Sequence, residues 1–413
     1  MRSARTGLVV TILIVIMSIL ACQRAAPPQP EEINIGCVVS ITGPFADIGL
    51  KVRNSADLAV CEINEADGIA GKKVKLLAED DAGDPERSRL AVKRLVEVSG
   101  VRIVVGPLKN DAVMSSGPYA SEKGVLFVSP SATSHSISAE PWSQWVFRTS
   151  TADTLQGKAL ADVVIANNYS KVAILYVKTD YGAAVSETAK KELEDKVNIV
   201  TYLGYDSGKF DYQGELVTIK DKRPDCVLHI GYLIDSIALY QQGMSMGLDE
   251  VQWLVSKDAY DEEMLRIPVV ADFMQRAVKG IRPTELWKIP EPPPGPICPV
   301  PAGTGHSVLG VEIKSAQDFA SAYSRKFGSI PGTYCDTTYD SVKLLALAIQ
   351  KAGIYDANKI RDALWDVGQD YVGASGTITF DKSGQRRSGP YEVWEVRRLD
   401  DKYKFVPIHL FTP

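Results

Sequence analysis

Short apolar runs rich in β-branched residues alternate with amphipathic stretches along most of the chain. Up to residue 129 the runs predict strands at 33–39, 74–79, 103–105 and 125–129, and the stretches predict helices at 54–66, 85–98 and 112–122. Asp84 directly precedes Pro85, so we expect Asp84 to cap the second helix and Pro85 to open its first turn. Strands that alternate with helices predict a mostly parallel sheet with helices on its faces.

A second series of the same kind begins after Arg148. It predicts helices at 156–167, 183–194, 212–221 and 234–243, and strands at 172–177, 197–202, 226–230 and near 253–255. Two series of similar size predict two similar α/β lobes. Periodicity leaves open whether the lobes are contiguous or interleaved along the chain.

A proline-rich stretch interrupts the pattern beyond residue 280. Residues 285–311 contain seven prolines, all between Pro290 and Pro301, and proline does not occur in helix interiors or central strands. We expect an insertion that is either an ordered surface segment or a partly mobile loop. After it, helices are expected at 316–327, 338–352 and 357–367, and strands at 376–380, 391–396 and 405–409.

The first residues of the chain predict export and lipid attachment. Arg2 and Arg5 precede an apolar run at 8–20, which suits a signal peptide and is short for a membrane span, although a retained anchor is the alternative. The sequence Ile19-Leu20-Ala21-Cys22 resembles the bacterial lipobox, in which the cysteine is acylated. We therefore expect a signal peptide at 1–21, a lipidated tether at 22–32, and a periplasmic or cell-surface location in which lipid alone holds the protein to the membrane.

Composition narrows the class of protein. The chain has 413 residues, of which 45% are hydrophobic and 23% charged, which is typical of a soluble globular protein of two or three domains. Its net charge is −5, and no basic stripe is interleaved with aromatic residues, so nucleic-acid binding is disfavoured.

Cysteine usage fits an exported protein. If Cys22 carries lipid, the five remaining cysteines are Cys37, Cys61, Cys226, Cys298 and Cys335, an odd number. Cys37 and Cys226 lie in predicted strands and are expected to be small core residues. Cys61 could face Cys37. Cys298 and Cys335 lie in loop-like sequence and are the best candidates for a disulfide. The chain has four widely separated histidines and no CxxC motif, so we expect no metal site.

No catalytic motif stands out, because the chain lacks a GxSxG elbow, an HExxH pair, a Walker loop and a dinucleotide fingerprint between strand and helix. Polar loops instead follow predicted strands at 40–46, 106–111, 129–134 and 177–182. Ligands of open α/β sheets bind beyond the carboxyl ends of the strands. Asn110, Ser131 and Thr133 could hold a carboxylate there beside helix N-termini, or they could simply cap their own helices.

These segments, taken in order, resemble the type I periplasmic substrate-binding proteins of the Leu/Ile/Val-binding family, the receptors of branched-chain amino acid ABC transporters. The resemblance runs from about residue 33 to 405. It rests on Thr42-Gly43-Pro44, Gly68-Ile69-Ala70-Gly71, Val105-Gly106-Pro107, Ser129-Pro130-Ser131-Ala132-Thr133, Asp180-Tyr181-Gly182, Tyr339-Asp340-Ser341 and Gly376-Thr377-Ile378-Thr379-Phe380-Asp381.

The resemblance implies two Rossmann-like lobes joined by a three-crossover hinge. Lobe 1 would comprise residues 33–149 and 283–386, with the proline-rich insertion 285–311 inside it. Lobe 2 would comprise residues 150–282 and 387–413. The ligand would lie in the cleft between the lobes, which close around it.

The resemblance also implies roles for particular residues. Ser131, Ala132 and Thr133 match the segment that holds the α-carboxylate and α-ammonium of an amino acid, and Asn110 stands where the family usually has Ser. Tyr181 matches the aromatic residue that covers the ligand, and Tyr232 is a second candidate. Asp258 matches the acid that pairs with the ammonium.

Asp336 departs from the family pattern. It stands near a position where receptors for hydrophobic amino acids present an aromatic residue, and an unpaired Asp does not suit a branched aliphatic group. The expected ligand is therefore an amino acid or a related small amide or carboxylate, without a commitment to leucine.

The implied function is that of a receptor that hands its ligand to the membrane permease and ATPase of an ABC importer, without a cofactor and without catalysis. Two other hypotheses use the same cleft. One is a ligand sensor that docks to a signalling partner, and the other is a secreted enzyme that would convert the ligand.

Overall fold

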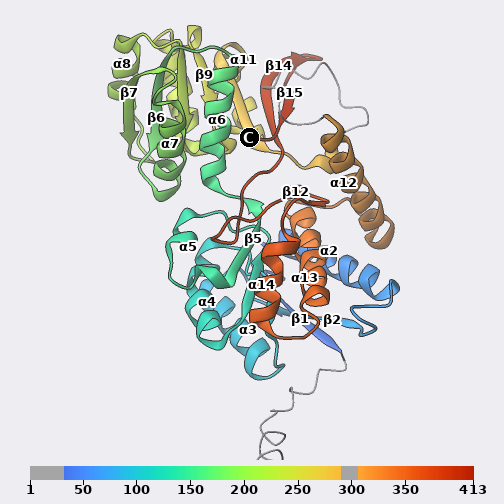
Figure 1. Ribbon diagram of the computed structural model, residues 1–413. Coiled ribbons are helices and arrows are strands. Elements are labelled where there is room, and N and C mark those ends of the chain that lie inside the picture. Colours follow the sequence, from blue (N-terminus) through green and yellow to red (C-terminus); the bar gives the residue numbers. More distant parts are fainter. Residues whose placement is uncertain (1–31, 290–305) are drawn as a thin grey trace, which may run out of the picture. The chain divides into compact units, whose positions relative to one another are not determined.

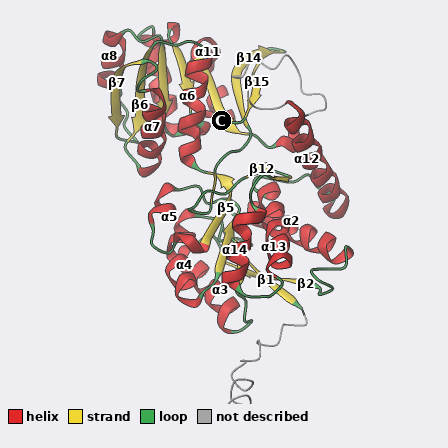
Figure 2. Ribbon diagram, viewed as in Figure 1, coloured by secondary structure: helices red, strands yellow, loops and turns green. Residues whose placement is uncertain are grey.

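The computed structural model describes residues 32–289 and 306–413. They form two large β-sheets, each flanked by helices, and one two-stranded sheet (Figures 1 and 2). The first large sheet has the strand order β13-β5-β4-β3-β1-β2, and its neighbouring strands are parallel. Its strands are β1 (Ile33–Val39), β2 (Val74–Asp80), β3 (Ile103–Val105), β4 (Leu126–Ser129), β5 (Val146–Thr151) and β13 (Gln385–Arg386). We call this sheet and its helices lobe 1.

The helices of lobe 1 come from two distant parts of the chain. The N-terminal part supplies α2 (Ala46–Glu65), α3 (Pro85–Glu97), α4 (Asn110–Lys123), α5 (His135–Ala139) and the short η1 (Ser143–Trp145). The later part supplies η4 (Leu286–Lys288), α12 (His306–Phe327), α13 (Cys335–Ala352) and α14 (Ala357–Val367), with the small sheet of β11 (Tyr371–Gly373) and β12 (Gly376–Ile378).

The second large sheet has the order β15-β14-β10-β9-β8-β6-β7, and it forms lobe 2 together with its helices. Its strands are β6 (Lys171–Val177), β7 (Asn198–Tyr205), β8 (Cys226–Ile230), β9 (Gln252–Val255), β10 (Val278–Pro283), β14 (Tyr391–Leu399) and β15 (Lys402–Phe411). Its helices are α6 (Asp153–Ala166), α7 (Asp180–Leu193), α8 (Gln213–Lys222), α9 (Leu233–Ser245), α10 (Glu262–Leu265) and α11 (Pro268–Ala277), with η2 (Leu248–Glu250) and η3 (Lys257–Ala259). The strand β14 is antiparallel to both β10 and β15.

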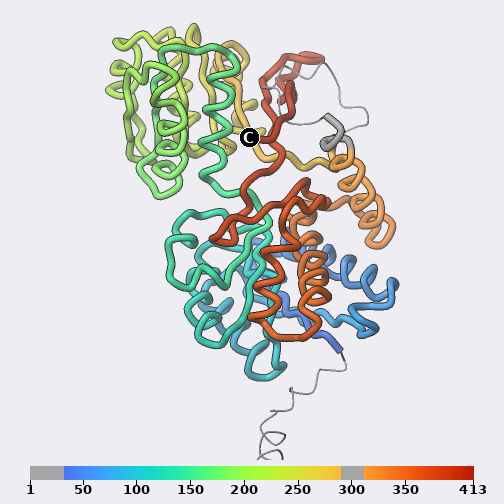
Figure 3. The backbone as a smooth tube through the Cα atoms, in the orientation of Figure 1, coloured from blue at the N-terminus to red at the C-terminus, as the bar shows by residue number. Residues whose placement is uncertain are grey.

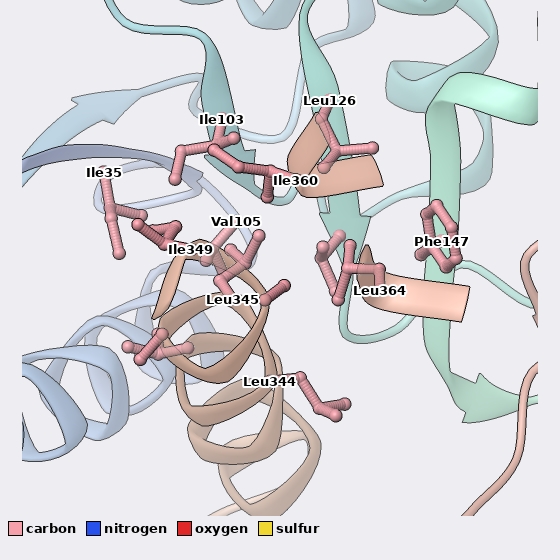
Figure 4. Close-up of a cluster of buried hydrophobic side chains, with 14 of the residues drawn as sticks. Ile35, Ile103, Val105, Leu126, Phe147, Leu344, Leu345, Ile349, Ile360 and Leu364 are labelled. Atoms are coloured by element: carbon pink, nitrogen blue, oxygen red, sulfur yellow. The ribbon is translucent and has the colours of Figure 1, made fainter. Parts of the chain in front are cut away.

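Alternate side chains of each central strand enter opposite cores, as the twofold repeat of a strand requires. In β1, Ile35 packs in a cluster with α13 and α14, whereas Val38 packs with α3 and α4. Figure 4 shows side chains of β1, β3, β4 and β5 turned toward Leu345 and Leu364 on the two C-terminal helices. Helices therefore cover both faces of the sheet, and the loops at its carboxyl edge are left to form a site.

The chain crosses from one sheet to the other three times (Figure 3). It leaves the first sheet after β5, returns after β10 and leaves again after β13. The two lobes are therefore interleaved along the chain, which periodicity had left open. The predicted fold class, two α/β lobes with parallel-rich sheets, is confirmed.

Several element boundaries differ from the prediction. Helix α2 begins at Ala46, eight residues before the predicted start, because Gly49 lets its first turn approach the carbonyl oxygen of Ser40, from which a Cβ would lie only 2.0 Å. Strands β5, β10, β11 and β13 were not predicted. Helix α12 begins at His306, so the end of the expected insertion is helical, while residues 290–305 lie outside the described part of the chain.

The predicted cap of α3 is confirmed. Asp84 accepts a hydrogen bond from the backbone N–H of Arg87 at 2.8 Å, and Pro85 occupies the first helical position.

Candidate functional site

One cavity of about 620 Å³ is lined by residues of both lobes. Four of the predicted site residues lie on its wall: Thr133 after β4, Tyr232 before α9, Asp258 in η3, and Asp336 in the first turn of α13. We call this cavity the cleft cavity. A concave space of this size, bordered by loops at strand ends, can enclose a small molecule.

A second cavity of about 520 Å³ adjoins the first through Tyr232, which lines both. Asn110 and Tyr181 lie on the wall of this second cavity. Ser131 and Ala132 are not among the residues that line either cavity: Ser131 Oγ donates to the carbonyl of Leu108 at 2.7 Å, and Ala132 is fully buried. The predicted site residues are thus divided between two adjoining spaces and the loop behind them.

Asn110, the first residue of α4, binds the loop that carries Thr133. Its Oδ1 accepts from the backbone N–H of Thr133 at 2.8 Å and from that of Ser134 at 3.1 Å. The sequence predicted that both residues would either hold a ligand carboxylate or cap their own helices. The structure instead has the Asn side chain as the acceptor, because its carbonyl oxygen reaches both N–H groups. The Thr133 hydroxyl remains as the candidate contact.

Two tyrosines of lobe 2 stack beside the cavities. The rings of Tyr181 and Tyr232 lie 5.8 Å apart at an interplanar angle of 20°. Tyr181 donates its hydroxyl to Gln156 Oε1 at 3.3 Å, and the Tyr232 hydroxyl lies 3.1 Å from Thr179 Oγ1. Burial and the nearby charge of Asp258 raise the pKa of Tyr181, so its hydroxyl stays protonated and can donate.

A lysine that the sequence analysis missed stands next to Asp258. Lys257 Nζ lies 3.2 Å from Asp153 Oδ1 and 5.6 Å from the centre of the Tyr181 ring. Burial would lower the pKa of Lys257, but the negative charges of Asp153 and Asp258 outweigh it and raise the pKa. The cleft cavity therefore contains a fixed cation. Asp153 lies 104 residues from Lys257 in sequence, so this ion pair could not be predicted from the chain. The only local signal was that Lys257 directly precedes the candidate residue Asp258.

Asp258 is partly buried, and burial raises its pKa, while the charge of Lys257 and the hydroxyl of Tyr181 act in the opposite direction. Its carboxylate is available on the cavity wall to a ligand ammonium group.

Asp336 lies on another part of the same wall and is almost fully buried. Burial and the charge of Glu285 raise its pKa to about 7. The site therefore combines a cation at Lys257 with carboxyl groups at Asp258 and Asp336, and this polarity suits a ligand that itself carries charges of both signs.

The profile of a family described as periplasmic binding protein matches residues 32–402, nearly the whole described chain. The chain belongs to the periplasmic binding protein family. Among its relatives is the Leu/Ile/Val-binding protein BraC3 of Rhizobium johnstonii, 28% identical over 388 residues that cover 92% of this chain and 97% of the relative.

Solved structures of the periplasmic binding protein family share the fold. The branched-chain amino acid binding protein LivJ of Streptococcus pneumoniae, in complex with isoleucine, is 23% identical, with a TM-score of 0.60 over 92% of this chain and all of LivJ. A solute-binding protein of Rhodopseudomonas palustris, in complex with 3,4-dihydroxybenzoic acid, is 20% identical, with a TM-score of 0.63 over 92% of this chain and 98% of that protein.

Membership of this family confirms the predicted relationship and a solute-binding role, and it places the protein among exported proteins that work with a membrane permease. Within the described residues, no helix is both long and apolar enough to cross a bilayer.

The described cysteines are Cys37, Cys61, Cys226 and Cys335, and no two of these four are bonded to each other. Cys37 and Cys226 are buried strand residues, as predicted, and Cys61 Sγ lies 3.3 Å from Glu65 Oε1. Cys22 and Cys298 lie outside the described part, so the lipid attachment and the Cys298–Cys335 disulfide stay predictions. The described residues contain no cluster of three or more side chains that could hold a metal ion.

Proposed function

We propose that this periplasmic binding protein binds an amino acid, or a related small amide or carboxylate, in the cleft cavity and delivers it to the permease and ATPase of an ABC importer. The observation that carries the proposal is the cavity itself, about 620 Å³ in volume, whose wall brings Thr133 of lobe 1 together with Tyr232 and Asp258 of lobe 2. The names of the relatives, which bind leucine, isoleucine and valine, support the ligand class.

In this proposal the ligand is held by groups of both signs. Asp258 accepts hydrogen bonds from the α-ammonium group, Lys257 attracts the α-carboxylate, and the Thr133 hydroxyl donates to it. The three groups lie on the wall of one cavity. Because they come from both lobes, a ligand that contacts all of them favours closure of the lobes.

Binding is tested by substitution of Asp258. A thermal-shift screen of L-amino acids identifies a ligand, and isothermal titration calorimetry then compares the wild type with Asp258→Ala. We expect Asp258→Ala to weaken binding by about tenfold or more, as loss of a charge-assisted hydrogen bond implies, with little change in melting temperature. Asp221→Ala, at an exposed position of α8, is the control for the loss of one charge. An unchanged dissociation constant in Asp258→Ala would exclude this role.

We further propose that the protein does not convert its ligand. Mass spectrometry of ligand released from the purified complex is expected to return the added amino acid unaltered. Recovery of a product would favour the secreted enzyme instead.

We also propose that Cys22 is acylated and anchors the protein, and that residues 1–21 are removed. For the lobes, we propose that lobe 1 comprises residues 33–149 and 283–386, and that lobe 2 comprises residues 150–282 and 387–413. The membership of the strands in the two sheets supports these boundaries to within two residues: β5 of the first sheet extends to Thr151, and β10 of the second sheet extends to Pro283. The variant Cys22→Ser is expected to appear in the soluble exported fraction, and its continued association with membranes would contradict lipidation.

A further inference from the structure

The wall of the cleft cavity beside α13 contains several charged residues. In most of them, the donor or acceptor groups already form hydrogen bonds within the protein. The buried Arg386 donates from Nε to the carbonyl oxygen of Ser388, from Nη1 to the carbonyl of Thr149 and the hydroxyl of Ser375, and from Nη2 to the carbonyls of Ser375 and Thr377. A guanidinium group has five N–H donors, and these contacts use all of them. Arg386 therefore has no donor left for a cavity carboxylate.

Asp340 is satisfied in the same way. Its Oδ1 accepts from the N–H of Ala374 at 2.8 Å, and its Oδ2 accepts from the N–H and the hydroxyl of Ser375 at 2.8 and 2.6 Å. The buried pair of Asp340 and Arg386 thus holds the segment before β12 in place and takes no ligand.

Asp336 and Glu285 form fewer hydrogen bonds than Arg386 and Asp340 do. Asp336 is only 5% exposed, and within the described chain its one hydrogen bond runs from the N–H of Thr337 to Oδ1, at 2.8 Å. Glu285 uses one carboxylate oxygen to pair with Lys288, while the other, Oε1, is buried without a hydrogen-bond partner among the described residues. Both side chains line the cleft cavity.

The other cations of the cavity wall, Arg282 and Lys257, pair with neither Asp336 nor Glu285. Arg282 pairs with Glu392 at 2.5 Å and lies 3.7 Å from the centre of the Tyr260 ring, and Lys257 pairs with Asp153. The charged groups that act on Asp336 are Glu285, Asp340 and Arg386, two of them negative and the third committed to other acceptors. Among the described residues, Asp336 thus has no ion-pair partner. Glu285 pairs with Lys288 through one oxygen only, so its Oε1 remains without a partner in the described chain.

We infer that the ligand supplies this cation: the protein binds an amino acid whose side chain ends in an ammonium or guanidinium group, which pairs with Asp336 and Glu285. The inference rests on the proposed function and specifies its ligand class. An aliphatic side chain in this place would leave the Asp336 carboxyl and Oε1 of Glu285 without a partner, whereas a cationic nitrogen forms charge-assisted hydrogen bonds to both. A bound metal ion is a poorer match, because hard cations take six or more oxygen ligands and the described residues form no ligand cluster of three.

Matched pairs of a cationic and a neutral ligand of similar shape test the inference. Isothermal titration calorimetry at pH 8 compares L-arginine with L-citrulline, and L-lysine with L-norleucine, which differ mainly in the terminal charge. We expect at least one cationic member to bind about tenfold or more tightly than its neutral partner. In Asp336→Asn, which keeps the acceptor for the Thr337 N–H, this preference should fall to within about threefold, and Glu285→Gln, on another element, should reduce it as well. Asp221→Asn should leave it unchanged.

Four results separate failure of the inference from failure of the proposed function. Equal affinity for the two members of each pair would overturn the inference, as would a preference that survives both Asp336→Asn and Glu285→Gln. Tight binding of leucine or norleucine that is unaffected by Asp336→Asn would overturn it while the proposed function stands. If no amino acid binds, charged or neutral, the proposed function fails together with the inference.

Discussion

At the scale of single residues, the carboxyl group of Asp336 links stability to binding. Burial and the charge of Glu285 raise its pKa to about 7 in the folded protein, above the ordinary value for an aspartate. A raised pKa in the folded state stabilises the protein fully at low pH, and this contribution is lost as the pH rises through about 7. Ionisation of this carboxyl group, which a cationic ligand requires, therefore destabilises the ligand-free protein.

Unfolding of the ligand-free protein tests this cost. Asp336→Asn should be more stable than the wild type at pH 8, by on the order of 2–4 kcal/mol, and the difference should shrink toward pH 5, where the wild-type carboxyl is protonated. Urea denaturation at the two pH values measures both differences. An equal difference at pH 5 and pH 8 would mean that Asp336 does not titrate in this range.

Positions on the cavity wall could be predicted from the segments that resemble a known family, while the roles of these residues stay predictions. Thr133, Tyr232, Asp258 and Asp336 were singled out from their segments, and they do line the cleft cavity. The contact of Asn110 with the loop of Thr133 was not foreseen, because it depends on how two loops meet across the carboxyl edge of the sheet.

At the scale of elements, regular apolar runs predicted most strands of the two large sheets, and two of the missed strands, β5 and β10, break the local rules for a strand. β5 carries Arg148, a buried arginine whose guanidinium donates to the carbonyl of Ser134 at 2.6 Å, and the three residues after it in the strand all carry hydroxyl groups. β10 contains Gly280 and ends in Pro283, both disfavoured in strands, and forms because β9 and β14 pair with it on either side. Strands β5 and β10 both lead directly into crossings between the lobes.

Gly280 is required by the close approach of β10 to its neighbour. A Cβ at this position would lie 1.9 Å from Cζ2 of Trp394, a fully buried side chain of β14. We expect Gly280→Ala to destabilise the protein by about 1–3 kcal/mol through overpacking. Gly214→Ala in α8, where nothing lies within 4 Å of the added Cβ, is the matched control and should be neutral or slightly stabilising. Equal melting temperatures of the two variants would contradict this account of the β10–β14 contact.

At the scale of the whole molecule, the three crossings decide where the site forms. They bring residues from several distant segments, among them Thr133, Asp258, Glu285 and Asp336, onto the wall of one cavity. Periodicity predicts the two α/β series but not their interleaving, because interleaving depends on which strands pair, such as β13 with β5 and β14 with β10. The resemblance to a known family supplied what the pattern of apolar residues could not.

The central claim is that the two lobes close over a small ligand held in the cleft cavity. Small-angle X-ray scattering of the purified protein, recorded with and without each member of a panel of L-amino acids, tests it most directly. The account predicts that at least one amino acid lowers the radius of gyration and that Asp258→Ala abolishes the change at the same ligand concentration. Scattering curves that stay identical with every saturating amino acid would contradict it.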